Sequence, residues 1–167
     1  MIELHLYDGN DNPLRRGGYK KVYDRPGVLH SPVYSVEDVR REVRIVGNTI
    51  GSINRLCFQT HGHPGLIYLP EGGIDSQSVS ILSKVCSLFM AKGAQVWIYG
   101  CQVAQGKIGE DFLKLLAQTM LGVGGGLALA TNSLTWSMPW YGQWLPPWGD
   151  VVAAKVQPGG AVTIVHP

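Results

Sequence analysis

Two apolar segments of the chain each end in a residue that can take part in nucleophilic chemistry. The run over residues 56–60 is followed by His61, and the run over residues 95–99 is followed by Gly100 and Cys101. Both runs have the composition of short buried strands. A free thiol with a pKa of about 8.5 is mostly protonated at neutral pH, so a nucleophilic cysteine needs a base beside it. The sequence therefore predicts that His61 is a base and Cys101 a nucleophile, provided that the fold brings them together.

The segments around these runs predict an α/β fold. We expect a helix over residues 36–50 with Ser35 as its N-cap, a second from about 75 to 92, and a third that starts near Gly106. The apolar residues expected to be buried on the second helix are Ile81, Leu82, Val85, Leu88 and Phe89. Those expected on the third are Ile108, Phe112, Leu115, Leu116 and Met120. Helices that alternate with short apolar strands favour a mostly parallel sheet with helices on both faces.

In such a sheet, ligands bind outside the carboxyl ends of the strands, which is where His61 and Cys101 are expected. If their strands are neighbours, about 5 Å apart, the imidazole and the thiol come within reach of each other. The positive end of the helix that follows Cys101 would favour the thiolate. The backbone N–H groups of Gly62 and Cys101 are candidates for an oxyanion hole.

The remaining segments complete one predicted domain over residues 1–167, with its core at about 33–131. Alternating side chains over residues 2–7 suit a half-buried strand, and residues 15–32 read as a loop with a short strand near 19–23. Residues 134–150 carry a tryptophan at every fourth position, but their prolines and glycine exclude a continuous helix, so we expect a loop or arm. Residues 151–167 have the pattern of a C-terminal β-hairpin.

The order of these features resembles the caspase-like cysteine peptidases of clan CD, which include caspases, legumain, gingipains, separase and bacterial CHAT domains. The matching residues are Thr60-His61-Gly62 and, about 40 residues later, Tyr99-Gly100-Cys101-Gln102. The string over residues 100–106, with Gly109, Phe112-Leu113 and Leu116-Ala117, is still more similar to an uncharacterised bacterial, CHAT-like relative found in large surface and exported proteins. The resemblance runs from about Arg55 to Thr131, and residues 142–144 match a Gly-x-Trp element beyond it.

The resemblance implies a caspase-like three-layer sandwich and a thiol protease in which His61 and Cys101 cleave peptide bonds through a thioester. Gly62 and Cys101 would supply the oxyanion hole. Gly100 stands where caspases carry alanine, and the caspase string Gln-Ala-Cys-x-Gly is absent. Residues that we consider for substrate binding are His63, Gln102, Trp136 and Trp144.

Other interpretations of the same residues remain open. His61 and His63 could be two metal ligands, with Cys101 or Asp75 as a third, but no full ligand set is visible, so we expect neither metal nor cofactor. Cys57 and Cys86 are expected to be core residues. The tryptophans could pack over the sheet, wall a substrate pocket or bind a partner.

Bulk composition excludes several classes of function. The net charge of +2, without a block of like charges, argues against nucleic acid or an anionic membrane as a partner. No apolar run approaches the roughly 20 residues of a membrane span, and no secretory signal is visible. Three cysteines without disulfide or zinc spacing suit a reducing compartment, so we expect a cytoplasmic protein, with export by another route left open.

The leading expectation is thus a cysteine endopeptidase that acts on a polypeptide. A catalytically inactive caspase-like binding module is one alternative. A cysteine amidase or deamidase on the same two residues is another.

Overall fold

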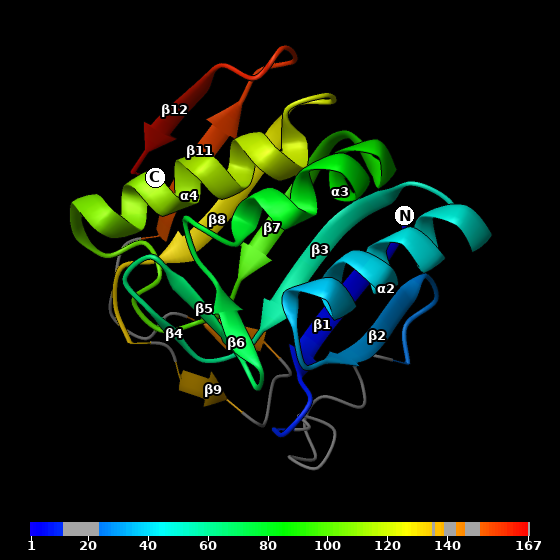
Figure 1. Cartoon of the computed structure of the whole chain (residues 1–167), viewed down its shortest axis with the longest axis horizontal. Coiled ribbons are helices and arrows are strands. Elements are labelled where there is room, and N and C mark those ends of the chain that lie inside the picture. Colours follow the sequence, from blue (N-terminus) through cyan, green and yellow to red (C-terminus); the bar gives the residue numbers. More distant parts are fainter. Residues whose placement is uncertain (12–23, 135, 139–142, 146–150, 167) are drawn as a thin grey trace.

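A seven-stranded sheet runs through the centre of the protein in our computed structural model, which describes residues 1–11, 24–134, 136–138, 143–145 and 151–166 (Figure 1). Its strand order is β12-β11-β8-β7-β3-β1-β2. The strands are β1 (Glu3–Asp8), β2 (Val28–Val33), β3 (Ile53–Gln59), β7 (Met90–Ile98), β8 (Gly126–Thr131), β11 (Val151–Val156) and β12 (Val162–Val165). β2, β1, β3, β7 and β8 pair in parallel, whereas β11 and β12 pair antiparallel as a terminal hairpin. The α/β class and the mostly parallel sheet are therefore confirmed.

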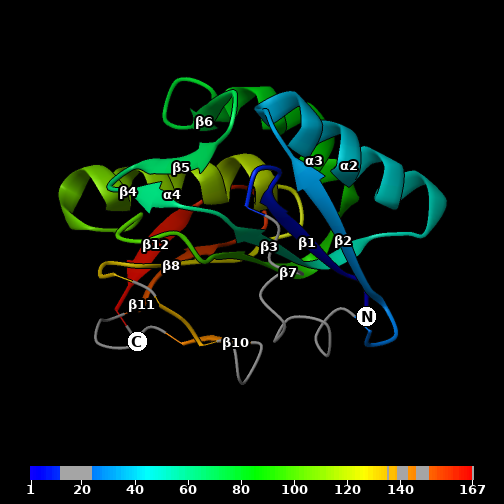
Figure 2. The same cartoon turned by 90° about the horizontal axis from the view of Figure 1, so that it is seen from below.

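All three α-helices in the described part of the chain lie on one face of the sheet (Figure 2). The expectation of helices on both faces is thus met for one face by the described residues. They are α2 (Val36–Thr49), α3 (Ser83–Phe89) and α4 (Gly106–Leu121). The connections from β2 to β3, from β3 to β7 and from β7 to β8 all move in the same direction across the sheet. Because crossovers between parallel strands are right-handed, moves in one direction place their helices on the same face.

The strand order also explains two errors in the N-terminal region. β1 is buried on both faces, since Glu3, His5 and Tyr7 are as inaccessible as the leucines between them. It lies between β2 and β3 rather than at an exposed position. β2 was expected to be a loop, but it is the edge strand, where Pro32 is tolerated because one side of the strand needs no backbone donor. The short strand expected near residues 19–23 lies outside the described residues.

Helix α2 begins as its sequence predicts. The Ser35 hydroxyl accepts a hydrogen bond from the Asp38 N–H, and the Asp38 carboxylate accepts one from the Ser35 N–H at 3.0 Å. This reciprocal pair is a capping box. Val39, Val43 and Val46 are buried against the sheet, whereas Ile50 lies just beyond the helix and is exposed.

The other two helices bury different faces from those expected. The second is shorter than predicted: a 3-10 turn, η2 (Val79–Leu82), leads into α3, and β7 begins directly after it. Leu82 is buried as predicted, but Ile81 and Leu88 are exposed. On α4, Ile108 is exposed and Leu115 is partly so. The residues of α4 that are buried are Gly109, Phe112, Leu113, Leu116, Ala117, Met120 and Leu121.

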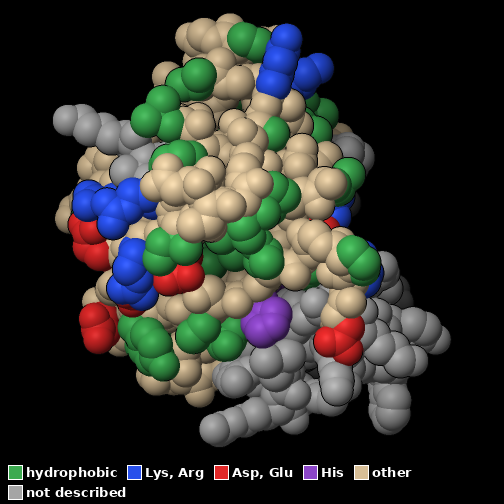
Figure 3. Space-filling view, turned by 90° about the vertical axis from the view of Figure 1, so that its right-hand side faces the viewer, with side chains coloured by type: hydrophobic (Ala, Val, Ile, Leu, Met, Phe, Trp, Pro, Cys, Tyr) green, Lys and Arg blue, Asp and Glu red, His purple; other side chains and the backbone are tan. Residues whose placement is uncertain are grey.

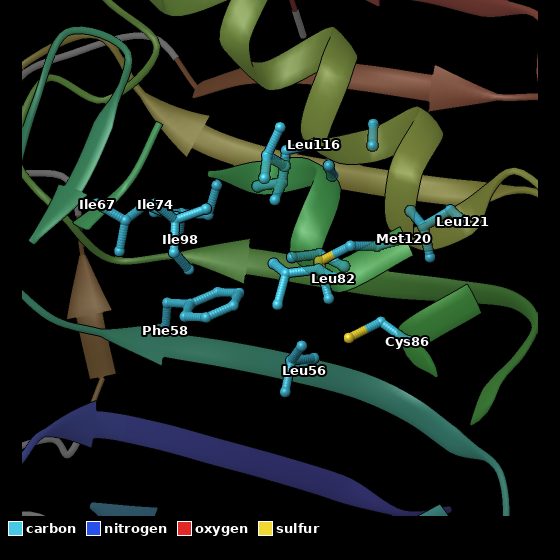
Figure 4. Packing of buried hydrophobic residues seen from close by; sticks show 14 of the residues in the cluster. Leu56, Phe58, Ile67, Ile74, Leu82, Cys86, Ile98, Leu116, Met120 and Leu121 are labelled. Atoms are coloured by element: carbon cyan, nitrogen blue, oxygen red, sulfur yellow. The ribbon is translucent and has the colours of Figure 1, made fainter. Parts of the chain in front are cut away.

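The hydrophobic core lies between the helices and the sheet (Figure 4). Leu56 and Phe58 from β3 and Ile98 from β7 point toward Leu82, Cys86, Leu116 and Met120 of the helical layer. Ile67 and Ile74 close one end of this core. They belong to a small antiparallel sheet made of β4 (Gly62–His63), β5 (Leu66–Leu69) and β6 (Gly72–Ile74).

The surface carries charges of both signs. In Figure 3, Lys and Arg side chains lie beside Asp and Glu side chains along one margin, and the apolar side chains form small separate groups. None of the helices in the described residues combines the length and apolar composition needed to cross a bilayer.

Candidate active site

The strands that carry His61 and Cys101 are direct neighbours. β3 and β7 pair in parallel, with Phe58 opposite Ile98, and the Tyr99 N–H donates a 2.9 Å hydrogen bond to the Phe58 carbonyl. His61 lies three residues after Phe58, and Cys101 lies three residues after Ile98. The fold therefore brings the two ends to the same edge of the sheet.

The two strand ends pass close to each other at Gly62 and Gly100. A Cβ atom on Gly62 would lie 3.0 Å from the Cys101 carbonyl oxygen, 3.1 Å from the Gly100 Cα and 2.4 Å from the Val103 Cγ2. A Cβ atom on Gly100 would lie 3.2 Å from the Gly62 Cα and 3.3 Å from its nitrogen. The His61-Gly62 and Gly100-Cys101 segments thus approach so closely that a Cβ atom at either glycine would crowd the other segment.

The turn after Cys101 is held by the end of β8. The Gln102 N–H donates to the Ser133 carbonyl at 2.8 Å, and the Ala104 N–H donates to the Thr131 carbonyl at 3.0 Å. Gln102 has a φ of 58°, the one positive φ of a non-glycine among the described residues. A non-glycine residue in this region costs about 1–3 kcal/mol and persists only where its surroundings impose it. The strained turn fixes the residue next to the candidate nucleophile.

Helix α4 begins shortly after this turn. The side chain of its N-cap residue, Gln105, makes no hydrogen bond to the N–H groups of the first turn. Its unpaired N–H groups and dipole give this end partial positive charge, which favours an anion such as a thiolate close by. Gly65 of the β4–β5 turn donates its N–H to the Val103 carbonyl at 3.0 Å, which ties the small sheet to the same turn.

Cys101 is the accessible cysteine of the three. It is half-buried, whereas Cys57 and Cys86 are fully buried. Burial raises the pKa of the Cys86 thiol to about 12 and raises the pKa of the Cys57 thiol as well. The burial of both side chains confirms their assignment to the core, and a raised pKa keeps both thiols protonated at neutral pH.

The His61 side chain is exposed, and its Nε2 lies 3.6 Å from Oδ2 of Asp11. Asp11 was not singled out from the sequence. It follows β1, and β1 lies beside β3, so the segment after β1 reaches the same sheet edge as His61. The sequence indicates a turn directly after β1, but only the strand order shows that this turn lies near His61.

Some of the candidate substrate-binding residues lie on segments next to this edge of the sheet. His63 is exposed on β4, with its ring centroid 6.0 Å from that of Tyr68. The Gln102 N–H donates a hydrogen bond to the carbonyl of Ser133, which lies three residues before Trp136. Residues 136–138 form β9 (Trp136–Met138), which pairs antiparallel with β10 (Gln143–Leu145) that carries Trp144. Trp140 and Trp148 lie outside the described residues.

The metal interpretation of His61 and His63 gains nothing from Asp75. Oδ1 of Asp75 accepts hydrogen bonds from the N–H groups of Gln77 and Ser78 at 2.9 and 2.8 Å, just ahead of η2. Among the residues described, one group brings three metal-type ligand atoms within 4.8 Å of one another, and it consists of Glu3, His5 and Cys57. The sequence had not marked this group.

Comparison with known families places the chain. The model of a family described as a domain of unknown function, DUF4347, matches residues 30–144. The chain belongs to the DUF4347 family. The DUF4347 match includes His61 and Cys101 together with the strands and helix that position them, and begins after Glu3 and His5. No curated protein matches the chain.

Proposed function

We propose that this DUF4347 protein is a caspase-like cysteine hydrolase, and specifically an endopeptidase, with His61 and Cys101 as its catalytic dyad. The observation that carries the proposal is the close approach of Gly62 to Gly100 and Cys101, at the carboxyl ends of neighbouring parallel strands. This is the edge at which open α/β sheets bind ligands.

The proposed reaction has two steps. The Cys101 thiolate attacks the carbonyl carbon of a peptide bond, a C–S bond forms, and the C–N bond breaks as protonated His61 gives its proton to the leaving amine. Water then attacks the thioester, His61 takes a proton from the water, and the C–S bond breaks to release the acid and restore the Cys101 thiolate beside protonated His61. No cofactor is required for either step.

The turn after Cys101 supports the electrostatic part of this reaction. The N–H groups of Gly62 and Cys101 arise from adjacent backbone segments, and we propose that they donate to the oxygen of the tetrahedral intermediate. The N-terminus of α4 would favour the thiolate. His63, Gln102, Trp136 and Trp144 are proposed to contact the polypeptide around the cleaved bond.

Cleavage of a mixed library of internally quenched peptides tests the proposal. We expect wild-type protein to cleave a subset of the library and Cys101→Ala to be inactive. His61→Ala should lose about 10²–10⁴-fold in kcat/KM, the usual contribution of a positioned acid and base. Cys86→Ala is the matched control, because it removes a buried thiol remote from the chemistry and should keep the activity of any folded protein.

Each failure points to a different class of function. Release of ammonia from glutamine or asparagine side chains without backbone cleavage would replace the endopeptidase with an amidase. Peptide binding by wild type and Cys101→Ala alike, without turnover, would identify a binding module. Activity that is abolished by chelators and restored by zinc would contradict the dyad.

A further inference from the structure

A group of polar side chains is buried on the sheet face opposite the helices. Glu3 and His5 project from β1, and Cys57 lies opposite His5 in the β1–β3 register. The three residues are 8, 3 and 0% exposed. Leu4, Leu56 and Phe58, which alternate with them, belong to the core under the helices.

The donor atoms of this group lie close together. Oε1 of Glu3 is 2.7 Å from Nε2 of His5 and 4.0 Å from Sγ of Cys57, and all three atoms are within 4.8 Å of one another. Zinc binds carboxylate oxygen and imidazole nitrogen at about 2.0–2.2 Å and thiolate sulfur at about 2.3 Å, so its tetrahedral ligands are roughly 3.3–3.8 Å apart. The observed separations bracket that range, and side-chain movements of about 1 Å or less would meet it.

The partners of these residues are those that zinc ligands usually have. Nδ1 of His5 lies 2.8 Å from the Gln59 side-chain amide, and rotation of that amide presents its oxygen to an Nδ1–H. Oε2 of Glu3 lies 3.6 Å from Nη1 of Arg55, whereas Oε1 lies nearest His5 at 2.7 Å, with Cys57 at 4.0 Å and Nη2 of Arg25 at 3.6 Å. Such contacts orient ligating imidazole and carboxylate groups.

The charges around this group are mixed. Glu3 supplies a carboxylate that would face a bound cation, and a thiol loses its proton when it coordinates zinc. Arg25 and Arg55 oppose a cation, but their side chains are 54 and 34% exposed, so solvent screens them.

We propose that Glu3, His5 and Cys57 form a zinc(II) site, with water as the fourth ligand. Nitrogen, sulfur and oxygen donors in a tetrahedral arrangement favour zinc over magnesium or calcium. The site departs from the expectation of a metal-free protein. It does not depend on the proposed hydrolase, because Cys57 lies within β3 and His61 follows it by four residues, beyond the end of that strand, about 13 Å away for extended backbone.

Titration of the full chain with cobalt(II) and zinc(II) tests this site. After chelator treatment and gel filtration, one equivalent of cobalt(II) should produce a thiolate-to-metal charge-transfer band, and zinc(II) should displace it. Cys57→Ser should abolish the band. Cys86→Ser and Cys101→Ser are matched controls and should retain it.

A second variant keeps the test decisive if Cys57→Ser does not fold. Gln59→Ala preserves all three ligands and should weaken zinc binding about 10–100-fold, the usual effect of losing an outer partner. Zinc should also raise the melting temperature of wild type more than that of Gln59→Ala. Absence of a band in wild type, or a band lost in Cys101→Ser and kept in Cys57→Ser, would overturn the proposal.

Discussion

Two glycines set the distance between the proposed catalytic residues. Gly62 and Gly100 face each other so closely that either Cβ atom would crowd the other strand end. An alanine at position 100 would press against the Gly62 backbone, so the close approach of the two strand ends favours glycine there.

Gly62→Ala should therefore disturb the site more than its size suggests. The added methyl group meets Val103 at 2.4 Å and the Cys101 carbonyl at 3.0 Å, so the strand ends must move apart. We expect a loss of about 1–3 kcal/mol in the free energy of unfolding, as for other overpacked sites. Reaction of Cys101 with a thiol-directed acyl probe should slow, and the two quantities are measured by urea unfolding and labelling kinetics.

Gly47→Ala is the control for this prediction. Its Cβ atom would meet the Phe89 ring at 2.2 Å, in the helical layer away from the strand ends. We expect it to reduce stability without slowing Cys101 labelling in the folded protein. Equal slowing by both variants would mean that general destabilisation, rather than the contact at Gly62, controls the reactivity.

Glu3 should make stability depend on pH. The hydrogen bond from His5 lowers the pKa of Glu3 below its ordinary value of 4.5 more than burial raises it. Its ionised form therefore stabilises the folded chain above about pH 4.5, and this contribution is lost as the pH falls through the lowered folded-state pKa. The difference in free energy of unfolding between wild type and Glu3→Gln should shrink on acidification. Urea unfolding in the presence of a chelator measures it, and a difference that stays constant would contradict the assignment.

The positions of single residues were predictable where local pattern was enough. The sequence placed His61 and Cys101 directly after two apolar strands, and these strands are neighbours in the sheet. The burial of Glu3 and His5 could not be predicted, because the alternation in β1 indicates one exposed face, whereas the folded chain buries both faces of this strand. Asp11 was missed because its proximity to His61 depends on which strands are neighbours.

At the scale of elements, α2 shows what a strong periodic pattern can predict. Its N-cap and its three buried valines were all expected. The segment from 79 to 89 was harder, because a 3-10 turn precedes α3 and changes the angle between successive side chains. A single period of 3.6 residues across both pieces therefore misassigned Ile81 and Leu88 to the buried face.

Two leucines of this segment offer a matched test. Leu82 is 0% exposed and Leu88 is 70% exposed. Leu82→Ala should cost about 2–5 kcal/mol of unfolding free energy, because it removes buried methyl groups and leaves a cavity. Leu88→Ala should change it by no more than about 0.5 kcal/mol. Similar losses of unfolding free energy for both variants would contradict this assignment and would mean that Leu88 is buried, as the sequence pattern predicted.

At the scale of the whole molecule, the direction of the crossovers decides which face is covered. Every described α-helix lies within a connection that leads across the sheet toward β12. Only the connection from β1 to β2 leads the opposite way. The hydrophobic pattern predicted the parallel sheet, but not the insertion of β1 between β2 and β3. That pairing joins residues distant in sequence and leaves no local signal.

The position of Phe58 makes it a probe of global stability. It is fully buried on a central strand, beneath the helical layer (Figure 4). Phe58→Ala should lower the free energy of unfolding by about 3–5 kcal/mol. Unfolding followed by far-ultraviolet circular dichroism and by tryptophan fluorescence should shift together, as expected for one cooperative unit. Separate transitions would show that the sheet and the tryptophan-bearing segments unfold independently.

The dyad itself is tested most directly by the rate at which Cys101 reacts with a peptidyl acyl-type probe, mapped by mass spectrometry. Wild type should be labelled at Cys101, because Cys57 and Cys86 are buried and protonated. His61→Ala should be labelled at least about tenfold more slowly, because it lacks the base that activates the thiol. Equal rates in wild type and His61→Ala, or labelling at Cys57 or Cys86 in the folded protein, would contradict the proposed active site.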